Sequence, residues 1–104
     1  MDPAKRPLVW SDVALARLLE IRDDLAERDP RAATKLLRRL LQRAESLTDF
    51  PQLGRVVPEL PDGELRELIE KPYRIVYRVR ATTLEVVTVF EGYREFPMGD
   101  ADEG

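Results

Sequence analysis

At 104 residues the chain is long enough for one hydrophobic core and too short for two, so a single domain is expected. Hydrophobic residues make up 43% of the sequence and charged residues 36%, which is typical of a highly charged folded domain rather than of a disordered chain. The chain has no cysteine and no histidine, which excludes disulfides, metal sites built on these residues, and catalytic arrangements that need a histidine base. Only carboxylates could then bind a metal, and they form no spaced cluster. We therefore expect no metal and no cofactor.

The distribution of charge is more informative than the net charge of -3, which gives no support for overall attraction to nucleic acid. Residues 66–80 are locally basic, whereas the last residues, DADEG, are acidic. The N-terminus has no apolar run of signal-peptide length, and no later segment is long enough to cross a membrane. A cytoplasmic protein without membrane contact is therefore expected.

The first half of the chain predicts a short strand followed by two helices. Residues 8–10 form an apolar run, and Ser11 follows them as a helix N-cap. Apolar residues then recur with helical spacing over residues 11–28. Asp29 precedes a proline at the first helical position, which is a second helix start, and this helix is predicted over residues 30–47. Because almost no residues separate them, the two helices should form an antiparallel hairpin.

Residues 48–64 break the helical pattern with three prolines and two glycines, so they are predicted to form a loop. The loop is too apolar for a flexible linker. We expect it to pack against the core through Phe50, Leu53 and Val56.

The second half of the chain predicts a sheet. Its short connections favour an antiparallel meander of three strands, at residues 64–69, 73–80 and 83–90. The predicted fold class is α+β: an N-terminal short strand, a helical hairpin, and then a three-stranded antiparallel meander, with the strands forming one sheet and the hairpin on one face of it. The whole chain, 1–104, is expected to be one domain, with a short N-terminal tail over 1–6 and an acidic C-terminal tail over 98–104.

The strand predicted over residues 73–80 has an unusual outer face. Its odd-numbered residues are apolar or aromatic and should face the core, whereas its other face carries Arg74, Val76, Arg78 and Arg80. A half-buried strand needs a polar outer face, but it does not need so many cations. The face could therefore be plain solvated surface or could bind phosphates or carboxylates.

The connection near residues 81–82 predicts how this strand pairs with the next one. A two- or four-residue loop gives the same register, in which Arg78 lies opposite Glu85 as a cross-strand ion pair. The same register pairs Val76 with Val87 and Arg74 with Val89. On this basis Arg74, Glu91 and Arg94 are expected to form a small polar cluster at one edge of the sheet.

Several short motifs occur in a characteristic order: FP at 50–51, GR at 54–55, PE at 58–59, LREL at 65–68 and YRIVY at 73–77. In this order and spacing they resemble the RelE/ParE superfamily of bacterial toxins over residues 8–97. The resemblance implies a small sheet backed by two N-terminal helices and the toxin half of a type II toxin-antitoxin pair. It also implies a cognate antitoxin protein that wraps around the toxin in a hetero-oligomer.

One branch of this superfamily cleaves mRNA on the ribosome. In that branch, arginines at the positions of Arg74 and Arg94 bind the scissile phosphate, whose oxygens the planar guanidinium group can contact in pairs. The position often held by a histidine base is Glu91 here, and Tyr93 is a candidate proton donor. Glu91 would be a weak replacement, because a carboxylate beside arginines stays charged. The lysines and the C-terminal tyrosine of that branch are missing from this chain.

The other branch poisons DNA gyrase and needs a binding surface rather than a catalytic set. The resemblance to this branch is the better one in the loop DFPQLGRVVPEL and in the helix before it, so a ParE-like toxin that inhibits a cellular target, with DNA gyrase the leading candidate, is the favoured function. Two alternatives stay open. One is a RelE-like ribosome-dependent mRNA endonuclease, and the other is an attenuated member that acts only as an antitoxin-binding module.

Four arginines are expected to contact the target or the antitoxin: Arg66, Arg74, Arg78 and Arg94. Arg74 is the strongest candidate, as an anchor for a phosphate or an antitoxin carboxylate. We expect the antitoxin to be acidic and partly disordered, with an amphipathic helix or strand that covers the arginine face.

Overall fold

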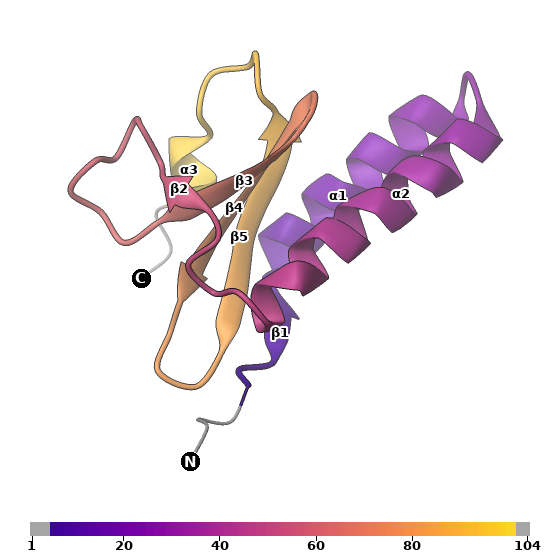
Figure 1. Ribbon diagram of the computed structural model, residues 1–104. Helices are drawn as coiled ribbons and strands as arrows, with labels where there is room; N and C mark the ends of the chain where they lie inside the picture. Colours follow the sequence, from indigo (N-terminus) through magenta and orange to yellow (C-terminus); the bar gives the residue numbers. More distant parts are fainter. Residues whose placement is uncertain (1–4, 102–104) are drawn as a thin grey trace.

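In the computed structural model, which describes residues 5–101, two long helices form an antiparallel hairpin against one face of a sheet (Figure 1). Helix α1 (Asp12–Ala26) begins where the Ser11 side chain accepts a hydrogen bond from the Ala14 amide at 3.0 Å. Helix α2 (Pro30–Glu45) begins in the same way, with Asp29 accepting from the Ala32 amide at 3.1 Å. A 3-10 turn, η1 (Ser46–Thr48), continues α2. The predicted helix starts are therefore confirmed, because a cap is a local feature of the chain.

Within residues 5–101, five strands form one sheet in the order β1-β5-β4-β3-β2. The short strand β1 (Leu8–Trp10) runs parallel to β5 (Leu84–Glu91), whereas β5, β4 (Tyr73–Val79) and β3 (Arg66–Glu70) form the predicted antiparallel meander. The predicted α+β fold class is thus confirmed. One strand was not predicted: β2 (Arg55–Val56) lies inside the segment expected to be only a loop and pairs with β3.

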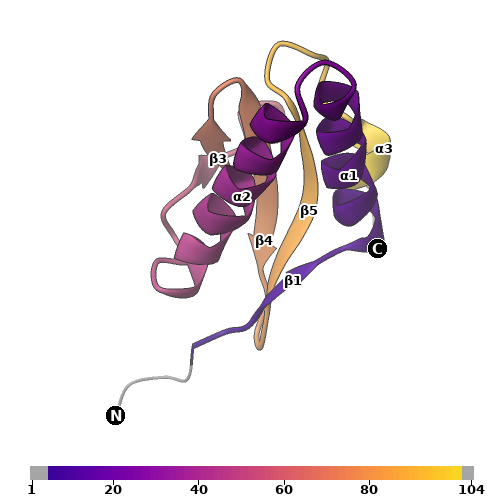
Figure 2. The same ribbon diagram turned by 90° about the vertical axis from the view of Figure 1, so that its right-hand side faces the viewer.

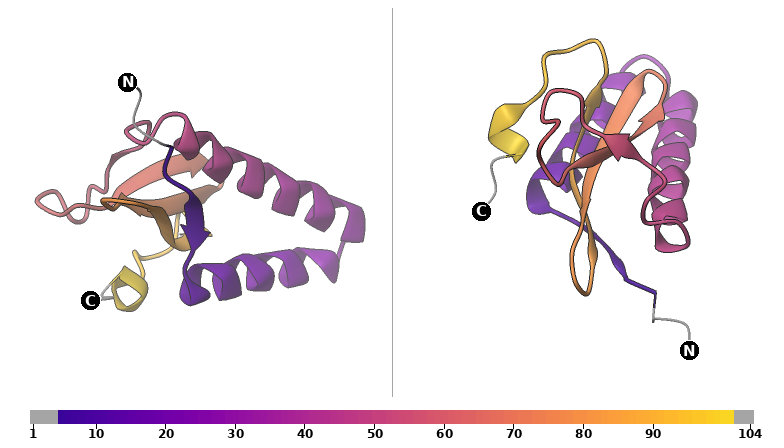
Figure 3. Two further views of the ribbon diagram at one scale, coloured as in Figure 1. Left: turned by 90° about the horizontal axis from the view of Figure 1, so that it is seen from below. Right: turned by 60° about the vertical axis from the view of Figure 1, so that its left-hand side comes forward.

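The sheet is covered on both faces, and each face has its own hydrophobic cluster. The hairpin packs on one face (Figure 2), where Ile75 and Tyr77 of β4 are fully buried with Leu18 of α1 and Leu40 of α2. The segment between β2 and β3 and the short helix α3 (Met98–Ala101) contribute to the cover of the opposite face (Figure 3). The cluster on that face consists of Val57, Leu65, Val76, Val87, Phe90 and Phe96.

The prediction that the face of β4 with Arg74 and Val76 is exposed to solvent is therefore wrong. Val76 is fully buried and Arg74 is 8% exposed, because chain segments distant in sequence fold over them. The stretch 98–104, expected to be an acidic tail, begins with α3 and places Asp100 in a buried position. The expected tail over 1–6 and the end of the chain lie outside the described residues at 1–4 and 102–104.

The register between β4 and β5 contains an irregularity that the sequence did not predict. Arg78 pairs with Glu85, as expected. The register shifts between Tyr77 and Val76. As a result, Val76 pairs with Thr88 and Arg74 pairs with Phe90. The predicted partners Val87 and Val89 are wrong because β5 holds one extra residue between Val86 and Thr88, as in a β-bulge.

The apolar loop after α2 also differs from its prediction. Phe50, Leu53 and Val56 are exposed, with Phe50 at 63%, so they do not anchor the loop to the core. The anchor is the hydroxyl of Tyr77, which donates to the Pro51 carbonyl at 2.9 Å and accepts from the Gly54 amide at 2.8 Å. A side chain at Gly54 would lie 2.6 Å from Tyr77 and from the Glu67 carbonyl, so only glycine fits there.

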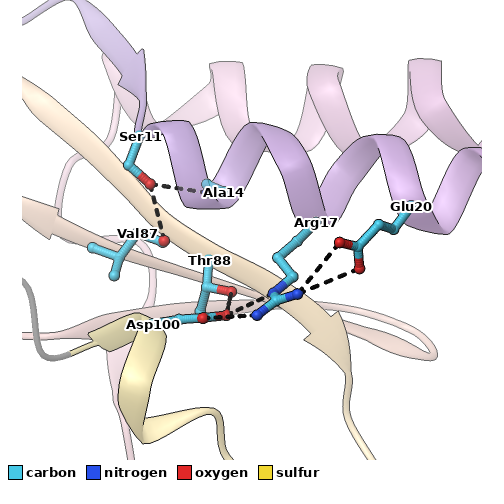
Figure 4. A network of polar contacts seen from close by, with 7 residues as sticks. All are labelled: Ser11, Ala14, Arg17, Glu20, Val87, Thr88 and Asp100. Carbon is cyan, nitrogen blue, oxygen red and sulfur yellow. Dashed lines mark hydrogen bonds and ion pairs between the residues drawn. The ribbon is translucent and has the colours of Figure 1, made fainter.

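Helix α3 is attached to the edge of the sheet by a polar network (Figure 4). Asp100 accepts hydrogen bonds from the Arg17 side chain of α1 at 2.9 and 3.0 Å and from the Thr88 hydroxyl of β5 at 2.9 Å. Three elements are thereby joined. Among residues 5–101, no helix is long and apolar enough to cross a membrane.

Candidate functional site

The side chain of Arg74 lies at the centre of a buried charge network on the face of the sheet away from the hairpin. Its Nε donates to Oε1 of Glu67 at 2.8 Å. Its two terminal nitrogens donate to the two carboxylate oxygens of Glu59, Nη1 at 2.9 Å and Nη2 at 2.7 Å. This fork-to-fork geometry is the strongest arrangement available to an arginine and a carboxylate.

Glu67 connects Arg74 to a second arginine. The Glu67 side chain is fully buried on β3, and Arg55 of β2 donates to its other oxygen from Nε at 2.8 Å. Glu67 and Arg55 are register partners across β2 and β3, so the sheet itself brings them together. A buried carboxylate is tolerated only when it is paired in this way.

Two aromatic rings complete the surroundings of Arg74. Its guanidinium carbon lies 4.9 Å from the ring centre of Phe90 and 5.7 Å from that of Phe96, both distances typical of cation–π contacts. Hydrogen bonds from Arg74 hold the pKa of Glu59 below its usual range. The pKa of Arg74 is itself raised, chiefly by its hydrogen bonds to Glu59. Both partners are therefore held in their charged forms.

The residues expected to act with Arg74 have different partners. Glu91 lies opposite Tyr73 at the end of β5, and Arg94 forms an ion pair with it at 3.4 Å. Arg94 is 65% exposed in its side chain. The expected cluster of Arg74, Glu91 and Arg94 is therefore not formed, because Arg74 faces the two glutamates on the loop and on β3.

Of the residues expected to act with Arg74, Tyr93 lines the same pocket. It is 76% exposed and shares with Arg74 the lining of a shallow pocket of about 330 Å³, together with Arg55 and Lys71. The pocket lining thus contains cations and an accessible phenol. It contains no carboxylate placed to act as a base, and the chain has no histidine.

The other two candidate arginines also have partners within the fold. Arg66 donates to the Gly54 carbonyl at 2.8 Å and so supports the loop beside Tyr77. Arg78 lies 3.5 Å from Glu85, which confirms the predicted ion pair, and its side chain is mostly buried rather than exposed. Among the four candidate arginines, Arg94 is therefore the one that presents most of its side chain to solvent.

Within the described part of the chain, no group of three or more carboxylates is arranged to hold a metal ion.

Comparison with known proteins identifies the family. Residues 8–96 match the family model of the ParE toxin of the type II toxin-antitoxin system parDE. The chain belongs to the ParE toxin family. The resemblance found in the sequence motifs is thereby confirmed.

Relatives of this ParE-family chain include a named bacterial toxin. The chain is 37% identical over 83 residues to Toxin RelE2 of Caulobacter vibrioides, an alignment that covers 79% of this chain and 90% of that protein. The fold is similar to that in the chromosomal ParDE toxin-antitoxin system from P. aeruginosa, with a TM-score of 0.73. That match has 22% identity and covers 86% of this chain and 98% of the other, so it supports the fold alone.

Membership in the ParE family makes this chain the toxin component of a type II toxin-antitoxin module, which implies an antitoxin partner. Sequence reasoning missed three residues of the central network in this ParE toxin: Arg55, Glu59 and Glu67. Glu67 could have been found, because the short turn at 71–72 pairs it with Val76 and places it diagonally from Arg74 on one face. Glu59 could not, because it reaches Arg74 from a loop.

Proposed function

We propose that this toxin acts by binding its cellular target, with DNA gyrase as that target, and that a cognate antitoxin neutralises it. The observation that carries this proposal is the position of Arg74. Its guanidinium group is already engaged by the carboxylates of Glu59 and Glu67 and lies under Phe90. Because its guanidinium nitrogens are hydrogen-bonded within the protein, Arg74 stabilises the fold and is not free to bind a ligand.

Phosphate binding at Arg74 is unfavourable for an electrostatic reason. A phosphate would have to displace one of the two glutamates and would then lie beside the remaining carboxylate in a poorly solvated place. Proton transfer lacks a suitable base as well, because the chain has no histidine and Glu91 is paired with Arg94. Inhibition by binding requires neither a phosphate site nor a base.

A surface suited to such binding lies on the outer side of α2. Arg31, Lys35 and Arg38 are exposed and recur with helical spacing, and Leu41 beside them is 40% exposed. By contrast, Arg39 and Arg43 are occupied, since both form ion pairs with Glu70 at the end of β3. The three remaining cations suit an acidic surface, such as that of a DNA-handling enzyme in complex with DNA.

A second candidate function is cleavage of mRNA on the ribosome. It is favoured by the name of the Caulobacter relative, Toxin RelE2, and by the exposed side chains of Tyr93 and Arg94. In that case the reaction would use these two residues at the shallow pocket without direct help from Arg74.

Controlled expression in a bacterium, followed by two assays with purified protein, separates these functions. We expect growth arrest, inhibition of DNA supercoiling by purified gyrase, and intact mRNA in a ribosome-dependent cleavage assay. Cleaved mRNA with normal supercoiling would overturn the proposal in favour of the endonuclease. Full growth at high expression would also contradict it and would mean that the chain only binds its antitoxin.

A further inference from the structure

A groove of about 340 Å³ lies between the helical hairpin and the turn that joins β3 to β4. We call it the hairpin groove. Its lining comes from both helices and from the turn: Leu25, Ala32, Lys35, Leu36, Arg39, Pro72 and Tyr73. Segments far apart in the sequence therefore form the groove, and it exists only in the folded chain.

The hairpin groove is fixed by packing and by one arginine. Leu36 is buried in the core cluster under the hairpin, and Tyr73 packs against that cluster. Arg39 ties α2 to the turn, because it donates to the Lys71 carbonyl at 3.1 Å and forms an ion pair with Glu70 at 3.0 Å. The apolar floor of the groove is consequently preformed.

The lining of the hairpin groove contains cations and no carboxylate. Lys35 is exposed and forms no ion pair within residues 5–101. Glu70, which binds Arg39 from β3, is shared with Arg43 and so carries no excess negative charge toward the groove. Burial is the main cause that raises the pKa of Tyr73, so its phenol stays an uncharged hydrogen-bond donor. The groove thus offers positive charge and a neutral donor beside apolar surface.

The same character continues on the other side of the turn. The shallow pocket beside Arg74 shares Pro72 and Tyr73 with the hairpin groove, and its lining likewise contains no carboxylate. Lys71 lines that pocket, is exposed, and forms no ion pair in the described part of the chain. Two hollows with cationic linings therefore adjoin at the turn, and each has an unpaired lysine.

We propose that the hairpin groove is the docking site for an acidic, amphipathic segment of the antitoxin, which places an apolar side chain over Leu36 and carboxylates against Lys35 and Lys71. The choice of occupant follows from charge complementarity, because both linings hold cations and no carboxylate. The apolar floor favours a protein segment over a nucleic acid, whose phosphates would lose water against it without a partner.

This inference rests on the antitoxin named in the proposed function and adds the position of its acidic segment. The face of β4 with Arg74, where that segment was expected, is covered within the fold. An occupant of the hairpin groove would also cover Lys35, one of the three exposed cations on the outer side of α2. Antitoxin binding would then block the proposed target surface directly.

The first test places a carboxylate in the hairpin groove. Isothermal titration calorimetry measures binding of the antitoxin encoded beside this gene to the toxin and to its Ala32→Glu variant. A glutamate at the third residue of α2 is favoured by the helix dipole, so this variant should fold. We expect about a tenfold or greater loss of affinity, because the new carboxylate pairs with Lys35 and repels the acidic segment. The matched control is Ala16→Glu, which makes the same change at an exposed alanine of α1 outside the groove and should bind within about twofold of the unchanged toxin.

Equal affinity of Ala32→Glu and the unchanged toxin would overturn the proposal, as would an equal loss in the control. An unchanged toxin that bound no antitoxin at all would contradict the antitoxin partner itself, and this inference with it. Because the titration contains no gyrase, its outcome is independent of the proposed target.

Labelling of lysines in the unchanged complex provides a measurement that no folding defect can disturb. Lys5, Lys35 and Lys71 are the three lysines of the chain, and acetylation followed by mass spectrometry reports on each of them. Lys35 and Lys71 should react at least about fivefold more slowly in the complex than in the free toxin. Lys5, which pairs with Asp49 beyond the other end of α2, should stay within about twofold. Unchanged labelling of Lys35, or equal protection of all three lysines, would contradict the proposal. Protection of Lys35 by gyrase and not by the antitoxin would assign the groove to the target and overturn it.

Discussion

At the scale of single residues, Arg74 and Glu67 depend on each other. The Glu67 side chain is fully buried, and its charge is compensated by Arg74 on one oxygen and by Arg55 on the other. Removal of one partner from a buried pair leaves an uncompensated charge, which typically costs about 3–5 kcal/mol. A loss of function after mutation of Arg74 would therefore report first on folding.

The first prediction concerns Arg74→Ala. We expect the free energy of unfolding to fall by about 3 kcal/mol, because Glu67 and Glu59 lose their shared partner. Urea unfolding followed by circular dichroism measures this change. Arg94→Ala is the matched control. Its side chain is mostly exposed and should cost less than about 0.5 kcal/mol. Equal stability of the two variants would mean that Arg74 is available for a ligand after all.

At the scale of secondary-structure elements, the C-terminal helix is held by charge rather than by a large apolar face. Asp100 joins α3 to α1 through Arg17 and to β5 through Thr88. Hydrogen bonds from Arg17 are the main reason that the pKa of Asp100 lies below its ordinary value of 3.8. Attachment of α3 should therefore depend on pH.

The sign of that dependence follows from the lowered pKa. The folded protein gains stability from the Asp100 carboxylate above the pKa of the unfolded state, and this gain is lost as pH falls from about 4 through the folded-state value. We expect Asp100→Asn to lower stability at pH 7 and to have less effect at pH 3. Thermal unfolding of both proteins across this range measures the difference. A constant gap between the two melting temperatures would contradict the prediction.

At the scale of the whole molecule, opposite charges occupy different surfaces. The outer side of α2 carries three exposed cations, whereas the pocket between α1, the end of β5 and the C-terminal segment is lined by five carboxylates and two arginines. The hairpin packs on one face of the sheet (Figure 1), whereas the buried network around Arg74 lies on the other face. Such a division gives partners of opposite charge separate surfaces.

The corresponding prediction concerns Lys35→Gln/Arg38→Gln. Removal of these two exposed charges should weaken gyrase inhibition by about fivefold or more while leaving the fold intact. The concentration of toxin that halves supercoiling measures the effect. Lys71→Gln/Arg80→Gln removes two exposed charges elsewhere and is the control. Equal inhibition by both variants would place the target contact away from α2.

Local patterns in the sequence by themselves determined the helical hairpin, the meander and the Arg78–Glu85 pair. Caps, helical periodicity and short connections act over a few residues, so they can be recognised without knowledge of the fold. The family could likewise be recognised, because its motifs are short and ordered along the chain.

Only the tertiary structure decided that both faces of β4 are covered and what Arg74 binds. The loop that carries Glu59 and the segment that carries Phe96 fold over the sheet, and the extra residue in β5 shifts the register beside Arg74. These features arise from contacts between residues far apart in sequence and from a single-residue irregularity in strand pairing. Neither leaves a periodic pattern in the sequence, because alternation within one strand records only that strand's own geometry.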